Sequence, residues 1–117
     1  MAIRNENGYS TTVLNIEDWD MSTATGSAAV VVSHGLSTDE WQTVRNIQAI
    51  IRDDTNAAHY PIGTINNAGT GAVNGAIEGW DSSAFNLIRY TTGFFDSADF
   101  NSTSYNRGWI TFDYIAD

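Results

Sequence analysis

The sequence contains no cysteine, no lysine and only one proline among its 117 residues. Without cysteine, neither a disulfide nor a thiolate zinc site can hold the fold, so packing alone must stabilise it. Charged residues make up only 16% of the chain, whereas Ser, Thr, Asn and Gly are plentiful. A surface that is polar through hydroxyls and amides is common in extracellular proteins.

Positive charge is also scarce, because the formal net charge is -9 and all five basic residues are arginines. They are scattered along the acidic chain: Arg4, Arg45, Arg52, Arg89 and Arg107. A nucleic-acid surface needs clustered cations that displace the counterions of the phosphates. We therefore expect neither nucleic acid nor an anionic membrane as a partner, and no apolar run is long enough to span a bilayer.

The end of the chain is its most informative stretch. A polar loop over residues 94–108 runs into GWITFDYIAD, in which Ile110, Phe112 and Tyr114 alternate with Trp109, Thr111, Asp113 and Ile115. Alternation of this kind predicts a strand with one buried face. We predict a single domain over residues 1–117, with residues 1–10 as an entry arm.

The rest of the chain predicts an all-β fold with about seven to eight strands and no internal repeat. The spacing of the apolar runs is typical of an antiparallel, jelly-roll-like β-sandwich. Asp81-Ser82-Ser83 predicts a hairpin turn, and Pro61 suits an edge strand. The other predicted strands are Thr11–Trp19, Ser27–His34, Val44–Asp53, His59–Ile62, Val73–Trp80 and Phe85–Thr91.

The segment around residues 37–53 fits two interpretations. Ser37 and Glu40 have the spacing of a capping box, and apolar residues follow at helical spacing. The same residues also alternate as in a strand. Because the surroundings are rich in β-formers, we predict a short helical turn at Thr38–Thr43 and then a strand.

No residue pattern indicates an enzyme. Ser33 and His34 are adjacent, but neighbouring residues of a strand point to opposite faces, so adjacency does not make them a nucleophile and its base. We expect the His34 ring to cap the strand end through a hydrogen bond. The local pairs of Asp residues lie in turn-like sequence, where Asp bonds to nearby backbone N–H groups.

One loop could hold calcium. Asp96, Asp99 and Asn101 supply hard oxygen ligands of the kind that Ca²⁺ prefers, although their spacing is not that of an EF-hand loop. The alternative is an ordinary loop of Asx turns. We predict no obligatory cofactor.

Aromatic residues are numerous for a core of this size, and an exposed ring can stack on a sugar or anchor an interface. Tyr105 lies in the polar loop with Asn101 and Arg107 and is the leading candidate for surface contact. Trp80 and Trp109 are further candidates, with core packing as the alternative. Arg107 could instead form a forked pair with carboxylates and pin the loop.

Four segments together resemble a known kind of protein: AVVVSHGL, VRNIQAIIRDD, HYPI and FDSADFNSTSYNRGWITFDY. From about Asn15 to Tyr114 the chain resembles a small β-sandwich module of tailed-bacteriophage virions, as in tail-fibre, tail-tip, head-fibre or decoration proteins. The resemblance implies a non-enzymatic structural or host-attachment role on the virion surface. It also implies a homotrimer that contacts other virion proteins, and a host glycan as a further partner.

The residues leave a second function open. A monomeric carbohydrate-binding module would use Tyr105, Trp109 or Trp80 as stacking platforms. The assembly state distinguishes the two hypotheses, because the virion module is expected to associate with copies of itself.

Overall fold

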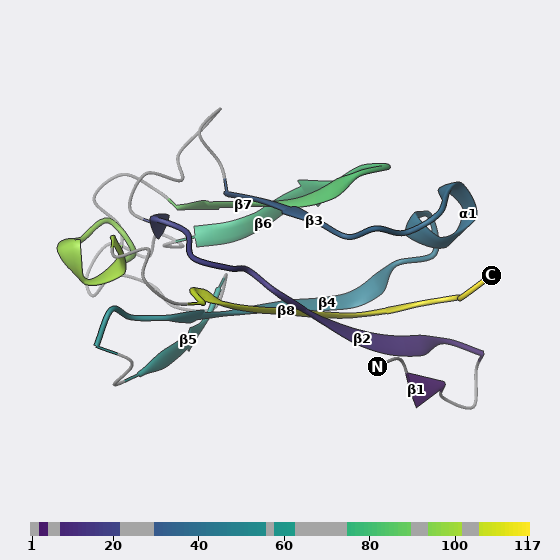
Figure 1. Cartoon of the computed structure of the whole chain (residues 1–117), viewed down its shortest axis with the longest axis horizontal. Coiled ribbons are helices and arrows are strands. Elements are labelled where there is room, and N and C mark those ends of the chain that lie inside the picture. The colour runs from purple at the N-terminus through teal and green to yellow at the C-terminus, as the bar shows by residue number, and fades with distance from the viewer. Residues whose placement is uncertain are drawn as a thin grey trace.

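The computed structural model describes residues 3–4, 8–21, 30–55, 58–62, 75–89, 94–101 and 106–117. Within these residues the chain forms two antiparallel sheets that face each other as the layers of a sandwich (Figure 1). The prediction of an all-β antiparallel sandwich is therefore confirmed. No helix in this part of the chain is both long enough and apolar enough to cross a membrane.

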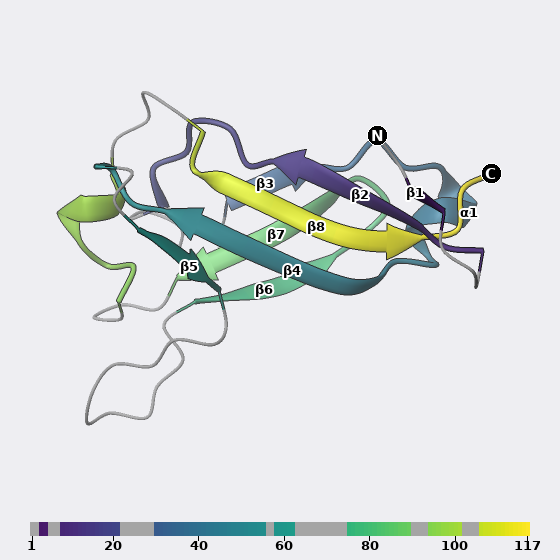
Figure 2. The same ribbon diagram turned by 90° about the horizontal axis from the view of Figure 1, so that it is seen from below.

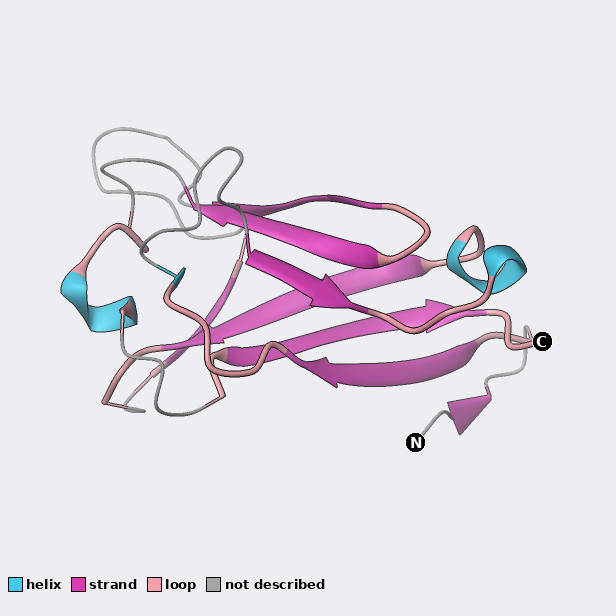
Figure 3. Ribbon diagram, turned by 45° about the horizontal axis from the view of Figure 1, so that its top comes forward, coloured by secondary structure: helices cyan, strands magenta, loops and turns pink. Residues whose placement is uncertain are grey.

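The larger sheet has five strands in the order β1-β2-β8-β4-β5, and Figure 2 shows it from its outer side. The smaller sheet has three strands in the order β3-β7-β6. The short helices α1 and η3 lie at opposite ends of the sandwich (Figure 3). The bounds of the elements are β1 Ile3–Arg4, β2 Ser10–Asn15, β3 Val30–Ser33, α1 Thr38–Trp41, β4 Arg45–Arg52, β5 His59–Pro61, β6 Gly75–Trp80, β7 Ala84–Arg89, η3 Ala98–Phe100 and β8 Gly108–Tyr114.

The alternation predicted for the last strand is confirmed. Ile110 and Phe112 of β8 are fully buried, whereas Trp109 and Thr111 on the other face are only half-buried. The Phe112 ring meets Phe85 of the opposite sheet, with 4.9 Å between ring centroids. This aromatic contact joins the two layers at the centre of the core.

The capping box is present as predicted. Ser37 Oγ accepts a hydrogen bond from the Glu40 N–H, and Glu40 Oε1 accepts one from the Ser37 N–H. Helix α1 nevertheless ends at Trp41, two residues before the predicted end, and β4 begins at Arg45. The strand interpretation is therefore correct for residues 45–52.

Several predicted strands are longer than the observed ones. Strand β2 ends at Asn15 rather than Trp19, and two residues later Glu17 has a φ of 70°, which takes the backbone out of the extended conformation. Strand β7 includes Ala84 and ends at Arg89. Strands β3 and β6 begin at Val30 and Gly75, and the predicted residues before each of them lie outside the described ranges.

Candidate functional site

A buried arginine holds one end of the sandwich together. The Arg107 side chain has an exposed fraction of 0%, and its guanidinium reaches three segments that are distant in sequence. Nε donates to the Trp19 carbonyl at 3.0 Å, Nη1 to the Arg52 carbonyl at 2.6 Å, and Nη2 to Asp54 Oδ1 at 2.7 Å. Because each bond involves a charged donor, this network is stronger than one of neutral groups.

The backbone beside Arg107 extends the same network. The Arg107 N–H donates to the Glu17 carbonyl at 2.6 Å, and the Arg52 N–H donates to the Arg107 carbonyl at 2.7 Å. The next residue, Gly108, has a φ of +153°, and a Cβ there would collide with the Ile50 carbonyl oxygen. The chain therefore needs glycine at 108 for β8 to pass this close to β4.

Arg107 is thus a structural residue. The prediction that it pairs with a carboxylate and pins a loop is confirmed by its bond to Asp54. The alternative, a direct contact between Arg107 and a partner, is wrong, because the side chain is wholly covered by the protein.

Trp109 lies on the outer face of the five-stranded sheet. Residues directly opposite one another on neighbouring strands share a face, and the register aligns Asn15, Trp109, Ile50 and Pro61 in one row across β2, β8, β4 and β5. We call this row the outer row. Beside it, Val13 is 54% exposed and pairs with Thr111. The sheet therefore presents an aromatic and apolar strip to its surroundings.

Two side chains of β4 and β5 flank the indole of Trp109. His59 meets it edge to face, with 5.5 Å between ring centroids, and the Arg52 guanidinium carbon lies 5.6 Å from the ring centroid. A half-buried indole beside a cation and the Asn15 amide can stack on a sugar ring or anchor a protein contact. The structure thus gives the neighbours of the Trp109 indole on this face, and its role in binding stays a prediction.

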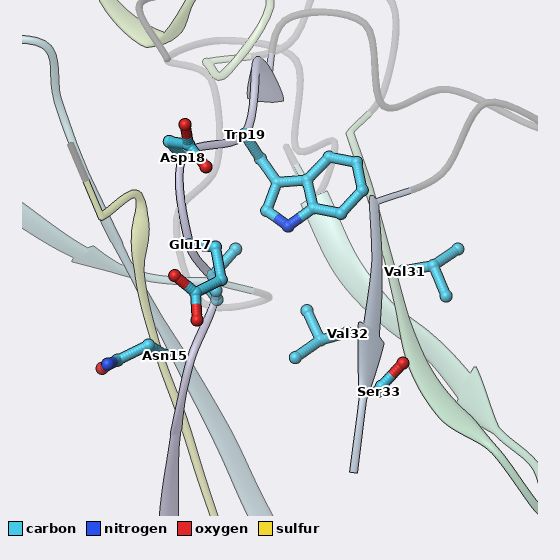
Figure 4. A pocket seen from close by; sticks show the side chains of 8 residues that line it. Asn15, Glu17, Asp18, Trp19, Val31, Val32 and Ser33 are labelled. Carbon is cyan, nitrogen blue, oxygen red and sulfur yellow. The ribbon is translucent and has the colours of Figure 1, made fainter. Parts of the chain in front are cut away.

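A groove of about 400 Å³ lies beside the outer row, with Asn15 of β2 in its lining. One wall is the segment that follows β2, with Ile16, Glu17, Asp18 and Trp19, and the other is strand β3. Figure 4 shows the Trp19 indole and the Val32 side chain in the space between these walls. We call this the β2–β3 groove.

Two further residues were predicted to bind a partner. Trp80 packs against the core and tilts over Phe85, with 6.0 Å between ring centroids, so core packing is its role. Tyr105 lies outside the described residues.

The residues predicted as calcium ligands in the polar loop make other contacts in the structure. Asp96 Oδ1 lies 3.2 Å from Arg89 Nη1, while the Asn101 N–H donates to Asp54 Oδ2 at 3.3 Å. Asp99 is exposed, and its N–H donates to Ser97 Oγ. In the described parts of the chain, no three His, Asp or Glu side chains gather so that they could hold a metal.

His34 caps the end of β3 as predicted. Its Nδ1 accepts the Leu36 N–H at 3.0 Å, and its Nε2 lies 2.8 Å from the Asp81 carbonyl oxygen and therefore carries the ring proton. The Asp81 carboxylate accepts the N–H groups of Ser83 and Ala84. These bonds, first the one from Ser83, hold the pKa of Asp81 below its usual range. His34 and Asp81 thus make the hydrogen bonds of the turn at this end of the smaller sheet.

The β2–β3 groove was not predicted from the sequence. Its walls come from a segment assigned to a continuous first strand and from a strand assigned to the interior. No Gly or Pro marks position 17, where the backbone leaves the extended conformation. Glu17 and Asp18, directly before Trp19, are the one sequence feature that could have indicated a surface site here.

Comparison of the chain with protein-family models, with curated proteins and with solved structures found no match.

Proposed function

We propose that the chain is a structural module of a bacteriophage virion, of the fibre-tip or decoration kind, that assembles with copies of itself. The contact surface would be the outer row with Val13, and the assembly a homotrimer. Host-surface attachment would be a second use of the same exposed face. The proposal assigns the protein a binding role and no chemistry.

The observation that carries the proposal is the outer row itself. It places Trp109, Ile50 and Pro61 side by side on a sheet face that no other described element covers. Aromatic residues are enriched and charged residues depleted at the centres of protein interfaces. The acidic groups of the chain, by contrast, would keep other faces of the module apart. The sequence resemblance to virion modules supports the same assignment.

Native mass spectrometry of the purified chain tests the proposal. A species at about three times the monomer mass of 12.8 kDa is expected. Trp109→Ser should return it to the monomer, because truncating an aromatic anchor removes a central interface contact. Ile115→Ser is the matched control, since Ile115 is 41% exposed but lies after the end of β8. A monomer at every concentration, or equal loss of the trimer in both variants, would contradict self-assembly.

A carbohydrate-binding module is the second candidate, and the flanked indole of Trp109 favours it. A sugar ring stacked on Trp109 could bond to the Asn15 amide and the Arg52 guanidinium. A glycan array of the monomeric protein and its Trp109→Ala variant distinguishes this function. Glycan binding by a monomer that Trp109→Ala abolishes would establish the lectin-like role, and trimer formation without glycan binding would reject it.

A further inference from the structure

We propose that the β2–β3 groove receives an extended, basic segment of a partner protein, which adds as a fourth strand to the edge of the three-stranded sheet. This surface shares Asn15 with the outer row but uses neither Trp109, Ile50 nor Pro61, so the inference does not depend on the proposed function. The proposal rests on a strand edge and two carboxylates that have no partner among the described residues, on an apolar floor, and on a backbone held in an uncommon conformation.

The free edge belongs to β3. Among the described residues this strand pairs only with β7, and none of them pairs with its other side, which we call its open side. The His34 N–H bonds to the Ser83 carbonyl on the β7 side, with an N···O distance of 3.2 Å. Since N–H and C=O groups alternate between the two sides of an antiparallel strand, those of Val31 and Ser33 point to the open side. They can form a ladder with an incoming strand.

The walls of the groove supply an apolar surface beside that edge. Trp19 is 38% exposed and Val31 is 46% exposed, values that are high for large apolar side chains. Val32 points into the groove (Figure 4), beside the buried Ile16. Alternate side chains of an added strand would therefore meet Trp19 and Val32, while the others would lie beside Val31.

The negative charge at the rim of the groove determines which kind of partner segment would bind. The carboxylates of Glu17 and Asp18 are exposed at the rim and make no ion pair or hydrogen bond with another described residue. No arginine lines the groove. A segment with Lys or Arg next to an apolar residue would complement this rim. A second copy of the chain is a poor occupant, because it has no lysine and its five arginines are scattered along the sequence.

The backbone of the acidic wall is fixed in advance. Glu17 has a φ of 70°, which is uncommon for a residue other than glycine. Its N–H donates to Asn106 Oδ1 at 2.8 Å, and its carbonyl accepts the Arg107 N–H. These bonds hold a conformation that would otherwise be unfavourable, and such conformations concentrate at binding sites. A wall that is already ordered loses little entropy when a partner docks.

Nuclear magnetic resonance can test the site with a defined probe. The probe is a capped peptide of about eight residues in which valine alternates with lysine, long enough to form a strand. The amides of Val31 and Ser33 should shift and exchange with solvent about tenfold more slowly at saturation, because new ladder bonds protect them. No change at these two amides at about 1 mM peptide would overturn the proposal.

Variants separate the groove from general attraction to an acidic protein. Glu17→Gln together with Asp18→Asn should weaken peptide binding about tenfold, as expected when charge pairs at a binding surface are lost. Glu78→Gln is the matched control, because Glu78 is exposed on β6, at the far edge of the same sheet. An equal loss in both cases, or equal binding of a peptide with glutamate in place of lysine, would reject the basic segment as the occupant.

A third variant tests the strand edge itself. Val31→Pro removes the outward N–H and leaves the ladder with β7 intact, since proline is tolerated on edge strands. It should abolish peptide binding without unfolding the protein, whereas Val31→Thr, which keeps the N–H, should bind as the wild type does. Undiminished binding by a folded Val31→Pro protein would show that the peptide does not add to β3, and would overturn the proposal.

Discussion

The segment from Glu17 to Trp19 has two sides, and the protein treats them in opposite ways. On one side the carbonyls of Glu17 and Trp19 accept hydrogen bonds from the backbone and side chain of Arg107, which is fully buried. On the other side the carboxylates of Glu17 and Asp18 and the indole of Trp19 border an open groove. On the first, closed side the carbonyls are hydrogen-bonded to Arg107, whereas on the second, open side the side chains are exposed.

The difference indicates how a small domain can keep an open surface. A buried, fully bonded arginine orders the backbone, so that exposed groups on the far side of the same residues keep a fixed arrangement. The groups that stabilise the fold and the groups that we propose bind a partner therefore lie on opposite sides of the same segment. Substitutions on the closed side should change the free energy of unfolding, whereas those on the open side should change binding.

Arg107→Met should have the largest effect. It leaves the carbonyls of Trp19 and Arg52 and the Asp54 carboxylate without their donor, and should lower the free energy of unfolding by about 3–5 kcal/mol. Urea denaturation measures this quantity. Arg52→Met is the control on the outer face, where the loss should stay below about 1 kcal/mol. Similar losses in the two variants would mean that the Arg107 network contributes no special stability.

Gly108→Ala should have the next largest effect. The added Cβ meets the Ile50 carbonyl oxygen and also disfavours the φ of +153°, so we expect a loss of at least about 2 kcal/mol. Gly79→Ala is the matched control, because a Cβ at 79 has no atom within 4 Å. Thermal unfolding of both variants decides the point, and an unchanged melting temperature for Gly108→Ala would refute the close approach of β8 to β4.

Glu17→Gly tests both sides at once. It removes a side chain from the open side, and it removes the unfavourable φ of the backbone on the closed side. Glycine adopts a φ of 70° without penalty, so the free energy of unfolding should rise by up to about 1 kcal/mol. Asp18→Gly, whose residue has no such φ, should be destabilising instead. A loss of stability in Glu17→Gly would show that the Glu17 side chain itself supports the fold.

Lowering the pH should have the smallest effect on the free energy of unfolding. The pKa of Asp81 is lowered in the folded state, so Asp81 stabilises the fold above the unfolded pKa of about 3.9 and loses that contribution as the pH falls through the folded pKa. Asp81→Asn should therefore be less stable than the wild type at neutral pH and equally stable in strong acid. Urea denaturation across this pH range measures the difference, and a difference independent of pH would contradict it.

The sequence was sufficient for the sandwich, because the signals that specify it are local. Alternation located β8, the capping box located α1, and Asp81 with its two serines located the β6–β7 hairpin. The Arg107 network could be predicted only in part. Its acidic partner lies 53 positions away, and the two carbonyls that it also binds carry no sequence signal.

The β2–β3 groove was missed for a related reason. A strand edge is open or covered according to the order of strands in the sheet, which alternation does not encode. The turn at Glu17 depends on Asn106 and Arg107, residues that follow it by 89 and 90 positions, rather than on its neighbours. Trp109 was a candidate because an aromatic residue in an alternating strand is a local feature of the sequence.

The position of β8 has a consequence for how the protein is made. This strand comes last in the chain, yet it lies between β2 and β4 and pairs with both. Its first partner is distant in sequence, as Ser10 pairs with Tyr114. Contacts of such long range slow folding, and the ribosome releases residues from the N-terminus first. Until β8 has been synthesised, β2 and β4 lack the strand that lies between them. A chain that stalled before β8 would therefore expose two unpaired strand edges, which promote aggregation.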